Sequence, residues 1–69
     1  MTKEEIGKAI KERRKTLRKT QEDIAEIIDI SVRSVVNFEN GKGNPSIKLL
    51  CDVLSTLGLS IELRAKKLD

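Results

Sequence analysis

Residues 20–46 have the sequence TQEDIAEIIDISVRSVVNFENGKGNPS, the most informative stretch of the chain. It contains two short segments with helical spacing of apolar residues, 20–29 and 31–40, and each begins with a hydroxyl residue that suits an N-cap. Asp29 lies at the break, where Asp tolerates a left-handed backbone better than most residues. Gly41 follows the second segment at a position typical of a left-handed C-cap. The stretch therefore predicts two short helices joined by a tight turn.

This arrangement is a candidate helix-turn-helix unit. Ala25 supplies a small residue where the two helices would cross closely. Val35 and Phe38 share one face of the second helix, so we expect them to be its buried anchors.

Further helices are predicted on both sides of this unit. Thr2 and Glu5 fit a capping box that begins a first helix. Ser46 or Asn44 is expected to cap a fourth helix that ends at Gly58. We expect one stripe of this helix to face the domain core and a second stripe, Leu49 and Val53, to face a partner. The first stripe comprises Ile47, Leu50, Cys51, Leu54 and Leu57, with Cys51 as a small buried apolar residue.

Beyond Gly58 the apolar residues alternate with polar ones, which is typical of a β-strand. No other segment has this pattern, so the edge would stay unpaired unless a second copy joined it. We predict an all-α domain of four helices over residues 1–58 and a dimerisation strand with a frayed tail over 59–69. The strand would form an antiparallel ribbon across a two-fold axis. The predicted dimer interface comprises Leu49, Val53, Leu59, Ile61 and Leu63.

Charge favours an anionic partner. The 69 residues form one domain with 14 Lys and Arg against 11 Asp and Glu, and residues 1–19 hold eight of these cations and only three Glu. Such an excess suggests nucleic acid, although a domain with charged faces explains it equally well on charge alone. The single aromatic residue, Phe38, argues against single-strand binding, which relies on several stacking aromatics.

Composition also excludes several classes of function. The chain has no His and one Cys, which excludes a His/Cys metal cluster and an intrachain disulfide, so we expect no metal and no cofactor. No nucleophile–base pair is apparent, so an enzyme is not expected. The first residues are charged and no 18-residue apolar run occurs, so we expect a cytoplasmic protein with no signal peptide and no membrane contact.

Between residues 5 and about 58 the sequence resembles the Cro/repressor-type (Xre) helix-turn-helix family. The resemblance is carried by Arg13-Arg14-Lys15, Thr20-Gln21-Glu22-Asp23-Ile24-Ala25, Ile30-Ser31, Asn37-Phe38-Glu39-Asn40-Gly41-Lys42 and Asn44-Pro45-Ser46. Residues 57–63 look like the C-terminal strand of HipB-type antitoxins, which are dimeric repressors that bind a HipA-type serine/threonine kinase toxin. Two positions depart from the family: Asp29 replaces the usual turn glycine, and Val36 replaces a small polar residue.

The resemblance implies that a recognition helix, Ser31 to Asn40, lies in the major groove of double-stranded DNA. The implied base-reading residues are Val32, Arg33, Asn37, Ser31 and Ser34. The implied phosphate contacts are Thr20, Gln21, Asn40, Lys42, Asn44 and Ser46. Arg14 and Glu39 match an internal ion pair of the family. Val32 fits a partly buried core residue equally well, and Lys42 could simply decorate a turn.

The function that the resemblance implies is repression of transcription by a homodimer on a palindromic operator. The leading interpretation is the antitoxin of a HipA-like module that represses its own operon. A phage-type repressor or restriction–modification controller without a toxin partner is one alternative. An interaction module with weak DNA binding is another.

Overall fold

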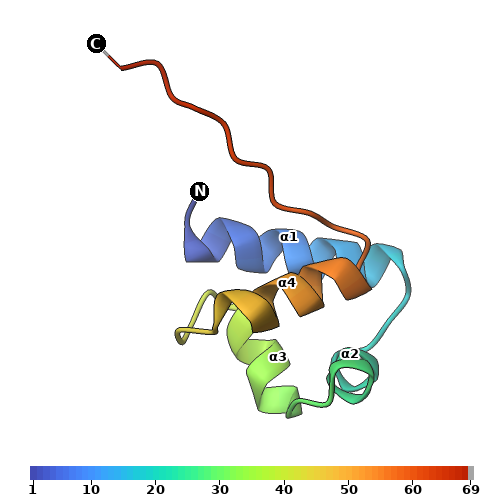
Figure 1. The fold of residues 1–69 in the computed structure, drawn as a ribbon. Coiled ribbons are helices and arrows are strands. Elements are labelled where there is room, and N and C mark those ends of the chain that lie inside the picture. The colour runs from blue at the N-terminus through green and yellow to red at the C-terminus, as the bar shows by residue number, and fades with distance from the viewer. Residues whose placement is uncertain (69) are drawn as a thin grey trace.

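The computed structural model describes residues 1–68, which form four α-helices and an extended segment (Figure 1). The helices pack so that α3 contacts both α1 and α2, and α2 also contacts α4. The prediction of an all-α domain of four helices is confirmed. No helix among residues 1–68 is long and apolar enough to cross a membrane. The helices are α1 (Lys3–Thr16), α2 (Gln21–Ile28), α3 (Val32–Glu39) and α4 (Ile47–Thr56).

Every helix begins at a hydroxyl N-cap whose side chain accepts a hydrogen bond from the backbone N–H three residues later. At the capping box predicted for Thr2 and Glu5, the structure gives only the bond from the Glu5 N–H to the Thr2 hydroxyl. The reciprocal box lies instead at α2, where the carboxylate of Asp23 also accepts the N–H of Thr20 at 2.8 Å. Of the two caps considered for α4, Ser46 is the one present. The caps are therefore Thr2, Thr20, Ser31 and Ser46.

Every helix also ends in the same way, with a residue in the left-handed conformation. The N–H of the residue after it donates to a carbonyl five residues earlier, as from Lys42 to Asn37 and from Leu59 to Leu54. This pattern is the Schellman motif, which satisfies carbonyls at the helix end. Asp29 and Gly41 were predicted for such positions, whereas Arg18 was not. The left-handed residues are Arg18 at φ 56°, Asp29 at 62°, Gly41 at 68° and Gly58 at 69°.

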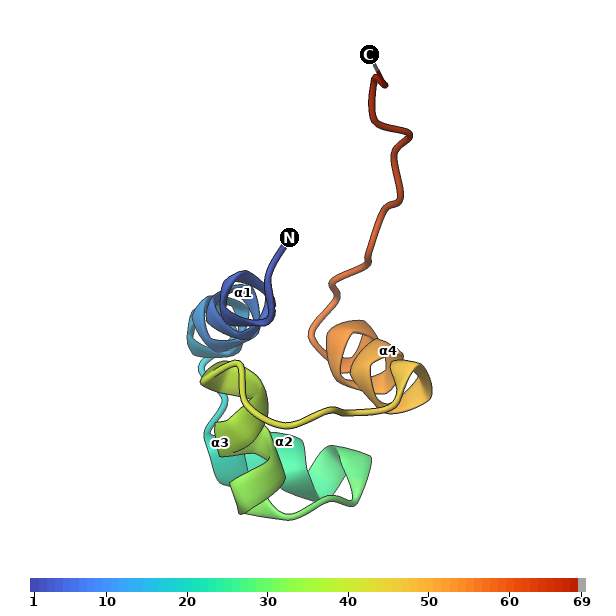
Figure 2. The same ribbon diagram turned by 90° about the vertical axis from the view of Figure 1, so that its left-hand side faces the viewer.

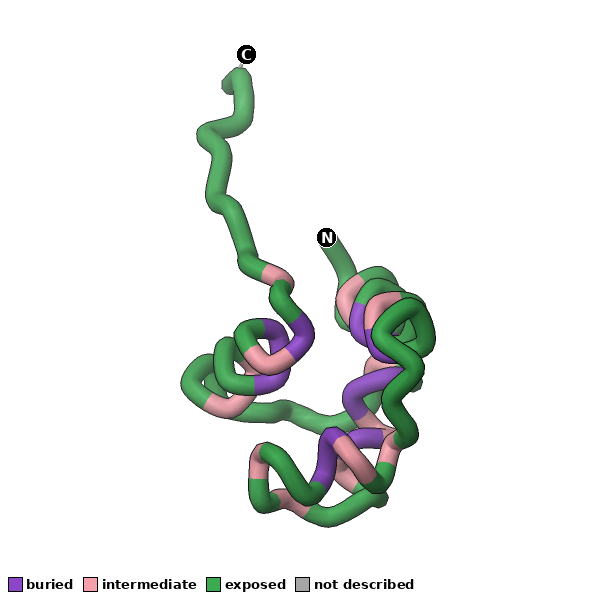
Figure 3. Tube along the Cα trace, turned by 90° about the vertical axis from the view of Figure 1, so that its right-hand side faces the viewer, coloured by how far each residue is buried: buried purple, intermediate pink, exposed green. Residues whose placement is uncertain are grey.

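The core lies where the inner faces of the four helices meet (Figure 3). Gly7 lets α1 approach α3 closely, because a Cβ at this position would lie 2.7 Å from the carbonyl oxygen of Glu39. The buried apolar residues are Ile10, Ile24, Ala25, Val35, Phe38, Val53, Leu54 and Leu57.

The predicted assignment of the two faces of α4 is only partly right. Leu50, Leu54 and Leu57 pack in the core as expected. The other predicted positions on this helix are wrong. Val53 is only 1% exposed within its own chain, and Leu49 packs against the same core. Ile47 is 82% exposed, and Cys51 is exposed as well. Residues 49, 50, 53, 54 and 57 share one side of the helix, and Ile47 and Cys51 lie to one side of that face. The apolar surface left for a partner is therefore that of Ile47 and Cys51.

The segment 59–68 leaves the helical body and extends away from it (Figures 1 and 2). It contains no strand, and residues 1–68 contain no strand elsewhere. A strand needs a hydrogen-bonded neighbour, and the single chain offers none, so the predicted strand does not form here. Leu59 still packs against the core, whereas Ile61 is 42% and Leu63 95% exposed.

Candidate nucleic-acid interface

The two short helices of the candidate unit are joined by a turn of three residues, with Asp29 in the left-handed conformation. The N–H of Ile30 donates to the carbonyl of Ala25 at 3.0 Å, so α2 ends here and the chain turns. Ser31 then caps α3 by accepting the N–H of Ser34 at 3.1 Å. Asp29 therefore adopts the left-handed conformation at the turn position where a glycine is usual.

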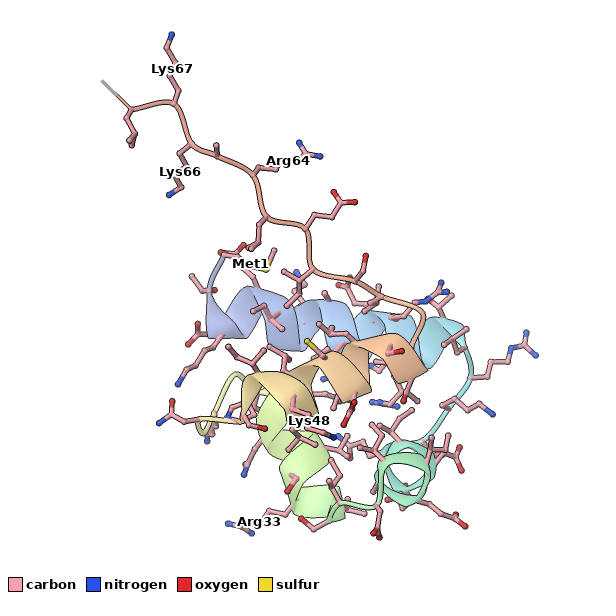
Figure 4. The ribbon with its side chains drawn as sticks, viewed as in Figure 1. Met1, Arg33, Lys48, Arg64, Lys66 and Lys67 are labelled. Carbon is pink, nitrogen blue, oxygen red and sulfur yellow. The ribbon has the colours of Figure 1, made fainter. Side chains whose placement is uncertain are left out.

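One side of α3 is buried in the domain, and the other side is exposed to solvent. Val35, Phe38 and Glu39 are buried against α1 and α2. Val32 is 37% exposed and Arg33 is exposed, whereas Asn37 is half-buried. Figure 4 shows Arg33 projecting from the first turn of α3, away from the other helices. This outward side can therefore enter a groove without disturbing the core.

The two serines implied as base readers are engaged with each other. The hydroxyl oxygens of Ser31 and Ser34 lie 3.0 Å apart, and the Ser31 hydroxyl also caps α3. Ser31 is thus primarily a cap. Ser34 lies one turn further along, beside Asn37, and both residues line an open groove.

This groove has a volume of about 180 Å³ and lies between α3 and the loop that leads to α4. It brings together residues implied for bases and residues implied for the DNA backbone. Ser34 and Asn37 line it from α3, and Lys42 and Asn44 line it from the loop. Phe38, Pro45 and Leu49 supply its apolar lining.

The implied phosphate residues lie at two places in the fold, the start of α2 and the stretch from the end of α3 to the start of α4. Gln21 lies at the start of α2, but its Nε2 donates to Oε1 of Glu39 at 3.1 Å, so its side chain links α2 to α3. Asn44 accepts a hydrogen bond from Lys3, whereas Lys42 is exposed in the loop. Asn40 is exposed at the C-cap of α3, and Thr20 and Ser46 are the N-caps of α2 and α4.

Arg14 and Glu39 form an ion pair between α1 and α3. Arg14 Nε donates to Glu39 Oε2 at 2.6 Å and Nη2 donates to Oε1 at 3.0 Å. The two side chains are only 10% and 2% exposed. A third donor, Nη1, reaches the carbonyl of Lys19 at 2.8 Å, so the pair ties together α1, the α1–α2 turn and α3. No buried side-chain polar atom in the described chain lacks a partner.

Burial on its own raises the pKa of Glu39. Hydrogen bonds from Arg14 and Gln21, together with the charge of Arg14, outweigh burial and hold the pKa of this carboxyl below its ordinary value. The same hydrogen bonding to Glu39 raises the pKa of Arg14. The pair is thus fully charged at neutral pH, and its role is structural.

Two contributors to this surface were missed from the sequence. Lys3 contacts the α3–α4 loop from 40 residues away, and Gly7 permits the close crossing of α1 and α3. An isolated glycine within a helical pattern is a usable sign of such a crossing. Nothing in the local sequence points to the Lys3 contact. No group of three or more possible metal-ligating residues occurs in the part of the chain described.

Comparisons with known proteins agree with this geometry. One curated relative is an uncharacterized HTH-type transcriptional regulator of Methanocaldococcus jannaschii, MJ0272, which is 37% identical over 43 residues. The match covers 62% of this chain and 65% of that protein, so the chain spans somewhat less than two thirds of its length. A solved structure named MDT Protein superposes with a TM-score of 0.83 and 28% identity, and the match covers 97% of this chain and 94% of that one. A family model described as Helix-turn-helix (HTH_3) matches residues 10–63. The chain belongs to this helix-turn-helix family.

Proposed function

We propose that the chain is a double-stranded DNA-binding repressor of transcription, with α3 as its recognition helix. One observation carries the proposal: α3 is anchored by Val35, Phe38 and Glu39, while the side chain of Arg33 on its opposite side is exposed and makes no ion pair or hydrogen bond within residues 1–68. The relative in M. jannaschii, named as a transcriptional regulator, supports the same class of function.

The outward residues of α3 fit base edges. An arginine can donate to both O6 and N7 of guanine, an asparagine can pair with adenine, and a valine can pack on a thymine methyl group. We assign these roles to Arg33, Asn37 and Val32. Ser34 lies beside Asn37 in the groove and can serve a base or a phosphate. Ser31 has the weakest claim, because its hydroxyl is already used as a cap.

Backbone contacts are assigned to the flanks of α3. Lys42 and Asn44 line the side of the groove towards α4, where a phosphate would lie when α3 enters the major groove. Thr20 and Gln21 begin α2, whose free backbone N–H groups suit a second phosphate. Asn40 and Ser46 complete the set at the two ends of the loop. These contacts would bind the DNA backbone and would not depend on base sequence.

We further propose a homodimer formed by segment 59–68. The exposed side chains of Ile61 and Leu63 would pair across a two-fold axis, and Ile47 and Cys51 on α4 offer an adjoining apolar surface. A palindromic operator would then receive two recognition helices about 34 Å apart. Deleting residues 59–69 should give a monomer with weaker DNA binding. Sedimentation at micromolar concentration tests this, and a truncated chain that remains dimeric would refute it.

The finer proposal is an antitoxin that binds a HipA-like serine/threonine kinase and represses its own operon. It rests on the resemblance of residues 57–63 and on the exposed apolar residues of that segment. Co-purification from the native host tests it. A stoichiometric kinase would support the antitoxin, whereas a lone homodimer would leave a plain repressor. Loss of specific DNA binding in both preparations would leave an interaction module.

Two alanine variants test the assignment of base and phosphate roles. Arg33→Ala should cost about 1–3 kcal/mol per half-site and relax preference at one base pair, because a guanine contact is lost. Lys42→Ala should weaken all sequences alike and reduce the slope of log affinity against log salt by about one. Duplexes selected by the wild-type protein from a random library are titrated beside scrambled duplexes at several salt concentrations. Equal weakening of both by Arg33→Ala would reduce Arg33 to a phosphate contact.

A further inference from the structure

Lys3, in the first turn of α1, is hydrogen-bonded to the loop between α3 and α4. Its Nζ donates to the carbonyl oxygen of Gly43 at 2.8 Å and to Oδ1 of Asn44 at 2.6 Å. The neighbouring backbone is also close, because a Cβ at Gly41 would lie 2.9 Å from Cα of Glu4. The start of α1 therefore contacts the loop at two points.

Two of the four residues in loop 41–44 are glycines. Gly41 and Gly43 both have positive φ values, of 68° and 80°, and a Cβ at Gly43 would meet nothing within 4 Å. Glycines lose more conformational freedom on ordering than any other residue. Lys42 lies between them, and Asn44 follows. A contact that crosses from α1 is thus well placed to hold this glycine-rich stretch in one conformation.

The chemistry of the contact also sets the direction of the Asn44 amide. An ammonium group has donors only, so it must meet the oxygen of the amide. Both hydrogens of Nδ2 then remain available on the other side. A phosphate oxygen accepts hydrogen bonds and cannot donate them, so Nδ2 is the end of this amide that a phosphate requires.

We propose that Lys3 is a positioning residue for DNA: it orders loop 41–44 and turns the Asn44 amide so that its donors face a backbone phosphate. This inference rests on the proposed function, since it assigns how the loop side of the groove binds DNA. Lys3 acts through Asn44 and Lys42, and its own Nζ is occupied by the loop.

The first measurement needs no DNA. Amide hydrogen exchange of Lys42, whose N–H donates to the carbonyl of Asn37 at 2.8 Å, is compared among the wild type, Lys3→Met and Lys8→Met. Lys8 is a matched control because it is an exposed lysine of α1 with no hydrogen bond to the loop. Exchange should rise about threefold to tenfold in Lys3→Met only, as expected for the loss of one or two hydrogen bonds. Unchanged exchange in Lys3→Met would overturn the ordering role.

The second measurement is a titration against a random-sequence duplex at several salt concentrations. Lys3→Met should bind about threefold to tenfold more weakly than Lys8→Met with an equal salt slope, because each variant loses one charge. Asn44→Asp keeps an acceptor for Lys3 but has no Nδ2 donor, so its loop should stay ordered while its affinity for the duplex falls.

A salt slope lower by about one in Lys3→Met than in Lys8→Met would make Lys3 a direct phosphate contact and overturn the proposal. If wild type binds no duplex, the proposed function fails; if it binds and Lys3→Met binds equally well, only the positioning role fails.

Discussion

Replacing Glu39 by glutamine should remove a large part of the stability of the fold. The amide has the same shape as the carboxylate, and its oxygen can still accept from Nη2 of Arg14 and from Gln21. Its NH₂ group would then face Nε of Arg14, which donates to Oε2 at 2.6 Å in the native chain. One charge-assisted hydrogen bond becomes a contact between two donors, and the guanidinium is left buried without a counter-charge.

The expected cost follows from burial. Removing one partner of a buried ion pair costs about 3–5 kcal/mol. A domain of this size has a free energy of unfolding of about 3–10 kcal/mol. The melting temperature should therefore fall by at least about 12 °C, since each kcal/mol shifts a small domain by roughly 4–8 °C.

Thermal melts followed by circular dichroism measure this effect, with Glu62→Gln as the matched control. Glu62 pairs with Arg64 at 3.7 Å, but its side chain is 75% exposed, so the same change should have little effect there. A double variant, Arg14→Met with Glu39→Leu, should recover most of the loss because apolar residues of similar size can replace a buried pair. If Glu39→Gln melts no earlier than Glu62→Gln, the pair does not stabilise the fold and the reasoning is wrong.

Three further predictions concern pH and backbone positions. The pKa of Glu39 is lowered in the folded chain, so the stabilisation that its charge provides is complete above the unfolded pKa near 4.3 and is lost as pH falls through the lower folded pKa. Thermal melts from pH 7 to pH 2 should therefore show the difference in melting temperature between wild type and Glu39→Gln narrowing below about pH 4. A difference that stays constant over this range would contradict the prediction. Gly7→Ala should lower the free energy of unfolding by about 1–3 kcal/mol in urea titrations, because its Cβ would press on backbone carbonyls of α3. This loss should exceed the gain from the better helix propensity of Ala. A stabilised variant would show that α1 and α3 are packed less closely. Arg18→Gly should raise the free energy of unfolding by up to about 1 kcal/mol in the same titrations, because Arg18 has a left-handed backbone with φ at 56°, which glycine adopts without strain. A loss of stability would show that the arginine side chain matters more than the backbone conformation.

Local features of the fold could be predicted because their causes lie within a few residues. The caps at Thr2, Thr20 and Ser31 each bond to an N–H three residues away, and the left-handed turn at Asp29 depends on that residue's own backbone. Such positions can be recognised without knowing how the helices pack.

The orientation of α4 could not be predicted in this way. Apolar residues occur around much of this helix, so periodicity allowed more than one side to face the core. Ile47 was expected inside and is 82% exposed, whereas Val53 was expected at an interface and is 1% exposed. Only packing against α2 and the rest of the core decides between such sides.

Contacts between distant residues were the hardest to foresee. Arg14 and Glu39 are 25 residues apart, and their pairing came from a family resemblance and not from spacing. Lys3 and Asn44 are 41 residues apart, and no resemblance suggested their contact. At the candidate site, therefore, the identity of the outward side of α3 was accessible from the sequence, but the support beneath and beside it was not.

The division of α3 into two sides has a consequence for how this surface can change over evolution. Val35, Phe38 and Glu39 hold the helix in place, while Arg33 projects from it and Val32 is 37% exposed. Substitutions on the outward side remove few internal contacts, so they cost the fold little. Under the proposed function, target preference and foldability are encoded by different residues of one short helix. A lineage carrying this scaffold would then acquire new binding specificities by drift at the outward positions without passing through unfolded intermediates.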